Sequence, residues 1–174
     1  MKYFFIIIMM FAPISVLSEW EYREIKDKMT DQVTYLAKIL NSDGHAFSIY
    51  RIDDNNIRGA FILSESNIRT IESNISILYR VDDNPAIDFS SAIDFQNTVS
   101  RVLGKSADMY VTHPRSVNFR LWVNDGGDIN PQIVRIMNGD KLLVRYFTSN
   151  SDYVDTLFSL NGAYDAIRKV LNNE

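Results

Sequence analysis

Few side chains in this sequence could do chemistry, and the histidines are the first to consider. Only two are present, His45 and His113. A catalytic triad needs a Ser, a His and an Asp brought together by the fold, and the G-x-S-x-G motif of α/β hydrolases does not occur here. His45 follows a glycine turn and His113 precedes Pro114, so we expect both in exposed loops and predict no catalytic histidine.

Paired aspartates are the second candidates, and they recur in a near-repeat. The sequence reads Y-R-I-D-D-N at 50–55 and Y-R-V-D-D-N at 79–84. Calcium needs six to eight oxygens from a loop of defined spacing, which neither copy has, so we expect two hairpin turns. The oxygen-rich stretch N-D-G-G-D-I-N at 124–130 is explained by a turn followed by an Asn helix cap. We predict no metal site and no cofactor.

The clearest strand carries the candidate binding residues. Residues 117–123 read V-N-F-R-L-W-V, with alternating apolar side chains. Because successive side chains in a strand point to opposite faces, Asn118, Arg120 and Trp122 are expected together on the face away from the core. An exposed Trp beside Arg is typical of a binding surface. We therefore name these three as candidate binding residues, and for Trp122 we favour a contact with the terminal helix over exposure.

The elements that must position these residues are mostly strands. Residues 33–40 have apolar spacings that fit both a strand and a helix, and we favour the strand. Asn130 and Gly139 bracket a short helix, and Asn161 precedes a terminal helix with one apolar face. We expect a mainly β fold, an antiparallel β-sandwich or partly open barrel of about eight strands with these two helices. The strand-like segments are 20–25, 33–40, 47–52, 57–63, 68–71, 75–81, 117–123, 142–147 and 154–160.

The first eighteen residues have the pattern of a secretory signal peptide. Lys2 precedes an uncharged run over 3–17, and V-L-S at 16–18 fits cleavage before Glu19. The run is shorter than the roughly 20 apolar residues that span a bilayer. We predict a signal peptide over 1–18 and one exported domain over 19–174, periplasmic or secreted. An inner-membrane anchor that retains 3–17 is the alternative.

Charge and cysteine content exclude several classes of function. Lys and Arg number 18 against 22 Asp and Glu, for a net charge of −4, and no basic run occurs. Nucleic-acid binding draws on clustered Lys and Arg, so we predict no nucleic-acid partner. The absence of cysteine excludes disulfides, thiolate metal ligands, cysteine nucleophiles and an acylated N-terminal cysteine.

The order of several motifs resembles a loose group of exported bacterial and prophage β-domains. The chain has E-W-E-Y at 19–22, D-K-M-T-D at 27–31, L-Y-R-V-D-D-N-P at 78–85 and F-S-L-N-G-A-Y-D-A-I at 158–167. The group includes the type VI secretion accessory proteins called VasI or TagO and, more distantly, the invasion-associated locus B proteins. The resemblance covers most of 19–172 and implies an accessory role, with no catalytic residue to carry over.

These observations lead to three functional hypotheses. The first is a non-enzymatic envelope domain that binds another envelope protein, as a secretion-system accessory or prophage envelope factor. The second is a β-barrel that encloses one small apolar ligand, with a membrane-anchored sensor as a candidate partner. The third is a carboxylate-based hydrolase of envelope glycans, whose two acidic residues would leave no local signature.

Overall fold

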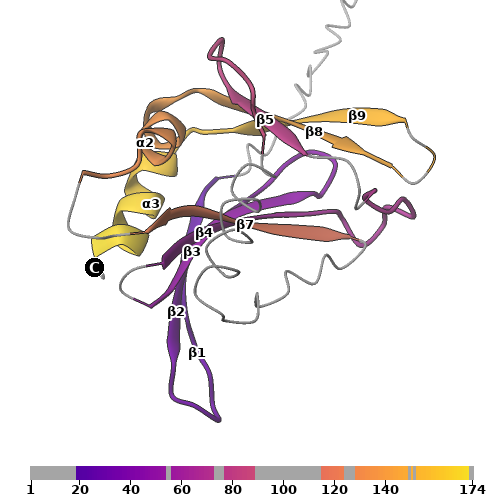
Figure 1. The fold of residues 1–174 in the computed structure, drawn as a ribbon. Coiled ribbons are helices and arrows are strands. Elements are labelled where there is room, and N and C mark those ends of the chain that lie inside the picture. The colour runs from indigo at the N-terminus through magenta and orange to yellow at the C-terminus, as the bar shows by residue number, and fades with distance from the viewer. Residues whose placement is uncertain are drawn as a thin grey trace, which may run out of the picture.

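Two antiparallel sheets packed face to face form the body of the protein (Figure 1). The computed structural model describes residues 19–53, 56–72, 77–88, 115–123, 128–148, 150 and 152–172. The five-stranded sheet has the order β1-β2-β3-β4-β7 and the four-stranded sheet the order β6-β5-β8-β9. The strands are β1 (Glu21–Lys26), β2 (Val33–Leu40), β3 (Ala46–Asp53), β4 (Asn56–Ile62), β5 (Leu78–Val81), β6 (Ile87–Asp88), β7 (Ser116–Val123), β8 (Lys141–Phe147) and β9 (Tyr153–Ser159).

The expected mainly β sandwich is confirmed, and the sheets do not close into a barrel. Residues 33–40 form a strand, as favoured. Residues 68–71 were expected as a strand, but only Ile71 pairs, in an isolated bridge with Thr148. The short strand β6 was not predicted, because a two-residue strand has no periodicity to detect. Both copies of the near-repeat end a strand that pairs antiparallel with the next one, as hairpin turns require.

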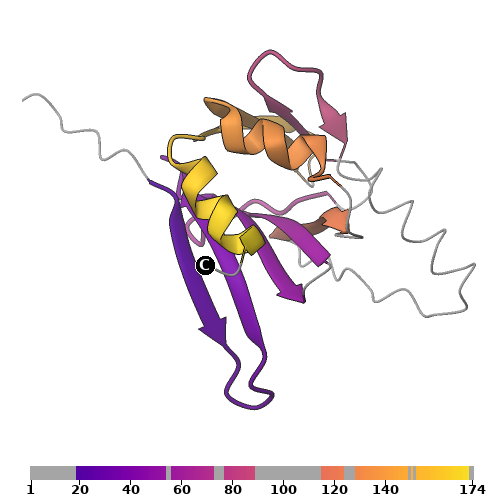
Figure 2. The ribbon, with the colours of Figure 1, turned by 90° about the vertical axis from the view of Figure 1, so that its left-hand side faces the viewer.

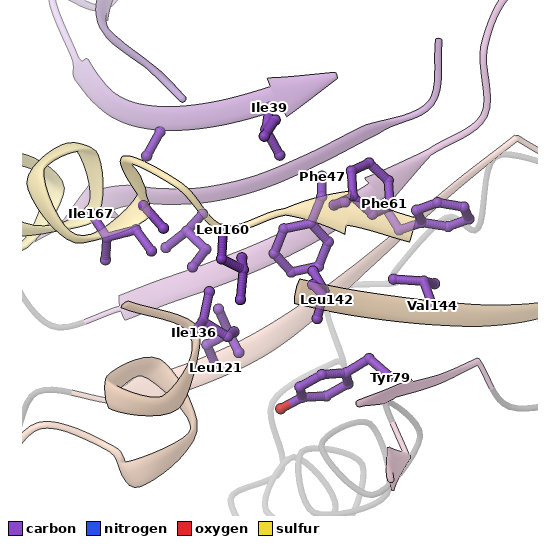
Figure 3. Packing of buried hydrophobic residues seen from close by; sticks show 14 of the residues in the cluster. Ile39, Phe47, Phe61, Tyr79, Leu121, Ile136, Leu142, Val144, Leu160 and Ile167 are labelled. Carbon is purple, nitrogen blue, oxygen red and sulfur yellow. The ribbon is translucent and has the colours of Figure 1, made fainter. Parts of the chain in front are cut away.

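Aromatic rings fill the space between the sheets (Figure 3). Phe47 on β3 is fully buried, with its ring centroid 6.2 Å from Phe119 and 5.9 Å from Phe158. The Phe119 ring packs directly against Gly59 on β4, and a Cβ at that position would lie 2.2 Å from a ring carbon. The inner face of the five-stranded sheet is therefore held in one arrangement by close packing.

Two helices lie together at one end of the sheets (Figure 2). They are α2 (Pro131–Asn138) and α3 (Ala163–Asn172), and α3 packs against β1, β2, β3 and α2. Asn130 caps α2, as predicted, by accepting the Gln132 N–H at 2.8 Å. Its amide also donates to the Leu121 carbonyl at 3.0 Å, which ties the start of α2 to β7.

Arg51 anchors the C-terminal end of α3. Its side chain is buried and stacks over the Tyr35 ring, 4.8 Å from the centroid. Its Nη1 donates to the Leu171 carbonyl at 3.0 Å. The last carbonyls of a helix lack intrahelical donors, so this contact both satisfies one of them and places a cation at the negative end of the helix.

The β1–β2 hairpin extends beyond the rest of the sandwich (Figure 1). Its turn is closed by Asp27, whose carboxylate accepts the N–H groups of Met29 and Thr30 at 2.7 and 2.8 Å. These bonds hold the pKa of Asp27 below its usual value. In the part of the chain that the structure describes, no helix has the length and apolar character to cross a bilayer.

Candidate functional site

The predicted patch on β7 is only partly assembled. Asn118 and Arg120 lie opposite Ala60 and Arg58 of β4, whereas Trp122 lies opposite Ile57. The register shifts between Ile57 and Arg58, so β7 has an extra residue there and strict alternation does not hold beyond Arg120. Trp122 is half-buried and packs against the hydrophobic core. The structure therefore brings Asn118 and Arg120 together and does not place Trp122 in the same row.

A row of polar side chains crosses three strands where Arg120 lies. Tyr50 of β3 pairs with Arg58 of β4, and Arg58 pairs with Arg120 of β7. The Tyr50 hydroxyl donates to the Asn118 Oδ1 at 3.3 Å. Strand pairing therefore places two guanidinium side chains directly opposite each other on this face. The Nε of Arg120 is also buried, and no acceptor bonds it among the described residues.

This row belongs to a sheet face with a strong bias towards positive charge, which we call the cationic face. Four of its residues are cations: Arg23, Lys38, Arg58 and Arg120. Its one carboxylate, Glu21, lies on the edge strand and is paired with Arg23 at 2.7 Å, which lowers the Glu21 pKa. The cationic face comprises Glu21, Arg23, Ile25, Thr34, Leu36, Lys38, Leu40, Ala46, Ser48, Tyr50, Arg58, Ala60, Ile62, Ser116, Asn118 and Arg120.

Small side chains lie beside the arginine row. Ser48, Ala60 and Asn118 follow one another across β3, β4 and β7, and Lys38 of β2 continues the row. Ser48 and Ala60 are each 4% exposed. The row of short side chains therefore lies next to Tyr50, Arg58 and Arg120, and the Tyr50–Asn118 hydrogen bond links the two rows. The charged groups of this face sit on a rigid sheet and not on loops.

The outer surface of the four-stranded sheet is built differently, and we call it the paired face. Arg145 makes two hydrogen bonds of 2.6 Å to the carboxylate of Asp155, and its guanidinium lies 4.6 Å from the centroid of the Tyr153 ring. The hydrogen bond to Arg145 lowers the Asp155 pKa, and its reciprocal raises the Arg145 pKa. A cavity of about 120 Å³ lies beside this pair. Its lining residues are Leu78, Tyr79, Arg80, Ala86, Leu143 and Arg145.

His45 was expected in an exposed loop, and this expectation is wrong. Its side chain is 4% exposed, and its ring lies edge-on to Phe61 and Tyr146. The Nδ1 accepts the Ser64 N–H at 2.9 Å, and the Nε2 lies 3.5 Å from the Tyr146 hydroxyl. Burial lowers the pKa of His45 below its ordinary value. These contacts give a neutral histidine that joins a loop to the core.

The turn before His45 explains why it is buried. The Asn41 Oδ1 accepts the N–H groups of Asp43 and His45, at 3.1 and 2.9 Å, and so folds the turn back onto the strands. The Asn41 amide donates to Thr156 Oγ1 at 2.5 Å and to the Leu157 carbonyl at 3.2 Å, across to β9. His113, the other histidine, lies outside the described residues.

Two aspartates of the near-repeat accept hydrogen bonds from residues in or near the turns. Asp82 adopts φ 49°, and its carboxylate accepts the N–H groups of Asp140 and Lys141. Asp53 accepts the side-chain amide of Asn56 at 2.8 Å. Within the described ranges, no three His, Asp or Glu side chains are grouped as metal ligands would be. Residues 124–127 of the second oxygen-rich stretch lie outside those ranges.

Tyr50 and Arg58 are site residues that the sequence analysis did not single out. Arg58 occupies an outward position in a strand that was predicted, so the face on which it lies follows from alternation. Its pairing with Arg120 could not be predicted, since β4 and β7 are separated by more than fifty residues. Comparisons with family models, with curated proteins and with solved structures found no match to this chain.

Proposed function

We propose that this chain is a non-enzymatic exported domain that binds another envelope protein through the cationic face. The observation that carries the proposal is the charge bias of that face, where one cation from each of β1, β2, β4 and β7 stands against the single carboxylate of Glu21. In a chain with a net charge of −4, cations gathered on one sheet face are expected to serve a partner of complementary charge.

The shape of this region favours a protein partner over a small apolar ligand. The sheet face is formed by side chains of β1, β2, β3, β4 and β7, whereas the interior between the sheets is occupied by the rings of Phe47, Phe61 and Phe158. Arg and Tyr are enriched among the residues that dominate protein interfaces. The sequence resemblance supports the same role, as a secretion-system accessory or a prophage envelope factor.

Position-specific photo-crosslinking in the envelope of the natural host tests the proposal. A benzophenone amino acid at Lys38 probes the cationic face, and the same group at Leu157, which is 50% exposed, probes the paired face. We expect a discrete adduct from position 38 that is absent from position 157. Equal adduct patterns from both positions, or none from position 38, would contradict the proposed surface.

Export is a separate part of the proposal and has its own test. The predicted cleavage leaves Glu19 as the first residue, directly before Trp20, whose indole N–H donates to the Ser159 carbonyl at 3.1 Å. We expect intact-mass measurement of the periplasmic protein to give a chain that starts at Glu19. A membrane-bound chain that retains residues 1–18 would select the anchored alternative.

A further inference from the structure

We infer that His45 is a pH-sensitive switch that holds residues 63–72 against the core when neutral and releases them when protonated. These residues, which we call the crossover segment, leave β4 in the five-stranded sheet and lead towards β5 in the four-stranded sheet. The inference does not depend on the proposed docking face, because the His45 ring is buried between the sheets, against Phe61 of β4 and Tyr146 of β8.

The hydrogen bond between His45 and Ser64 requires a neutral ring. The Nδ1 of His45 accepts the Ser64 N–H at 2.9 Å, so this nitrogen carries no proton in the folded protein. A proton on Nδ1 makes it a donor, and two N–H groups would then face each other. Arg115 cannot replace the lost contact, because its guanidinium bonds the Ser64 carbonyl and leaves the Ser64 N–H without an acceptor. Protonation therefore drives Ser64 away from the ring and towards water.

The crossover segment is built to move without the sheets. Its far end is joined to the four-stranded sheet, where the Glu72 N–H donates to the Phe147 carbonyl at 2.8 Å. Between the two ends, Ile68 is 96% exposed, and the residues around it form a turn closed by the Asn67 N–H and the Ser64 carbonyl at 3.0 Å. A segment with little buried apolar surface opens at lower cost than a core strand. Loss of the His45 contact is therefore expected to release this turn first.

The surroundings of the ring disfavour a positive charge on it. The titratable and charged side chains that face His45 and its two contacts, among the described residues, are Asp43 of the preceding turn, Tyr146 of β8, Arg69 of the crossover segment and Arg115 before β7. Burial lowers the His45 pKa, and the Asp43 carboxylate opposes this shift without cancelling it. The two guanidiniums add further positive charge.

The sign of the pH effect follows from the two states of the segment. In the open state the ring reaches water and regains its ordinary pKa of 6.5, whereas burial lowers that pKa in the closed state. The closed state is therefore favoured above pH 6.5. Below pH 6.5 the balance shifts towards the open state by up to about 10-fold per pH unit, until the lowered pKa is passed.

Amide hydrogen exchange followed by NMR at pH 7.5 and 5.5 tests the switch. After correction for intrinsic exchange, protection of the Ser64 amide should fall by up to about 10-fold at pH 5.5. The amide of Leu142, a fully buried residue of β8, should exchange more slowly than that of Ser64 at both pH values. His45→Asn places an oxygen where Nδ1 was and does not titrate, so it should remove the pH dependence. His113→Gln, the control at the other histidine, should leave it in place.

Three results would overturn the switch. They are Ser64 protection that is the same at both pH values, equal exchange rates of Ser64 and Leu142 at pH 5.5, and a folded His45→Asn protein that keeps the pH dependence. Equal rates would mean that the whole domain opens and not the crossover segment. If His45→Asn does not fold, the ¹⁵N shifts of the wild-type imidazole decide. Nδ1 should gain its proton over the pH range in which Ser64 loses protection, and two separate ranges would overturn the inference.

Discussion

The two sheets of this sandwich each present arginines on their outer surface, and the arginines are in opposite situations. On the paired face, Arg145 is bound by both oxygens of Asp155 and stacked on Tyr153. On the cationic face, Arg120 lies opposite Arg58, and its buried Nε has no acceptor among the described residues. The Arg145 guanidinium is thus bound within the fold, whereas one buried nitrogen of Arg120 has no acceptor in the part of the chain that the structure describes.

This difference separates structural arginines from candidate binding residues. Arg145 gains its hydrogen bonds as the chain folds, so no partner is needed to explain it. Arg51 is a third case, since it is buried and bonded to the end of α3. Arg58 and Arg120 differ from both, since strand pairing places them directly opposite each other. A net charge of −4 makes such a concentration of cations on one face more informative than it would be in a basic protein.

The largest expected effect concerns the core beneath the cationic face. Phe119 is 1% exposed and points inward between Asn118 and Arg120 on β7. Phe119→Ala should lower the free energy of unfolding by about 3–5 kcal/mol, the usual cost of removing a buried aromatic ring. Urea denaturation followed by circular dichroism measures the change.

Tyr153→Ala on the paired face is the matched control. Tyr153 is 62% exposed and contacts Arg145 through its ring, so its loss should cost less than about 1 kcal/mol. Similar losses of unfolding free energy for the two variants would contradict this prediction, because a buried ring and an exposed ring would then contribute equally to stability.

A smaller effect is expected from pH, and it should affect stability without affecting the cationic face. In the unfolded chain His45 takes up a proton near its ordinary pKa of 6.5, while burial lowers that pKa in the folded protein and nearby Asp43 opposes the shift. The unfolded state therefore binds more protons as pH falls below 6.5. Stability should be fully present above pH 6.5 and decline below it until the folded-state pKa is passed.

Urea midpoints at pH 7.5 and 5.5 measure this dependence. The wild-type midpoint should fall on acidification, and His45→Gln should reduce the difference. Crosslinking from position 38 should stay the same at both pH values, because arginine and lysine remain charged throughout. A wild-type midpoint that rises at pH 5.5 would show that the buried histidine is not stabilised in its neutral form.

The smallest expected effects have opposite signs on the two faces. Arg145→Gln removes a partly exposed ion pair and should cost about 0.2–1 kcal/mol of unfolding free energy. Arg120→Gln removes one member of a like-charge pair and should leave stability unchanged or raise it by a few tenths of a kcal/mol. Thermal melts at low ionic strength compare the two, and a larger loss for Arg120→Gln would reverse the assignment of roles.

Alternation and turn residues predicted most of the fold, because these signals are local. The strands around Phe47 and Phe61, the cap at Asn130 and the hairpin turns follow from neighbouring residues alone. The displacement of Trp122 could not be predicted, since the bulge in β7 depends on how that strand pairs with β4. The burial of His45 likewise depends on contacts with Ser64 and Tyr146, distant in sequence.

Two residues of the candidate site were predicted from the sequence and two were not, for the same reason. Asn118 and Arg120 are two apart on one strand, so alternation placed them on one face. Their contacts with Tyr50 and Arg58 come from strand pairing between distant segments, which sets the charge environment. Local pattern therefore identified candidate residues, and strand pairing supplied the neighbours that make them one charged face.

Photo-crosslinking from the two sheet faces tests the central claim most directly. A benzophenone amino acid is placed at Lys38 on the cationic face and, in a second protein, at Leu157 on the paired face, which is 50% exposed. The account predicts a discrete adduct from position 38 that is absent from position 157. Equal adduct patterns from the two positions, or none from position 38, would contradict it.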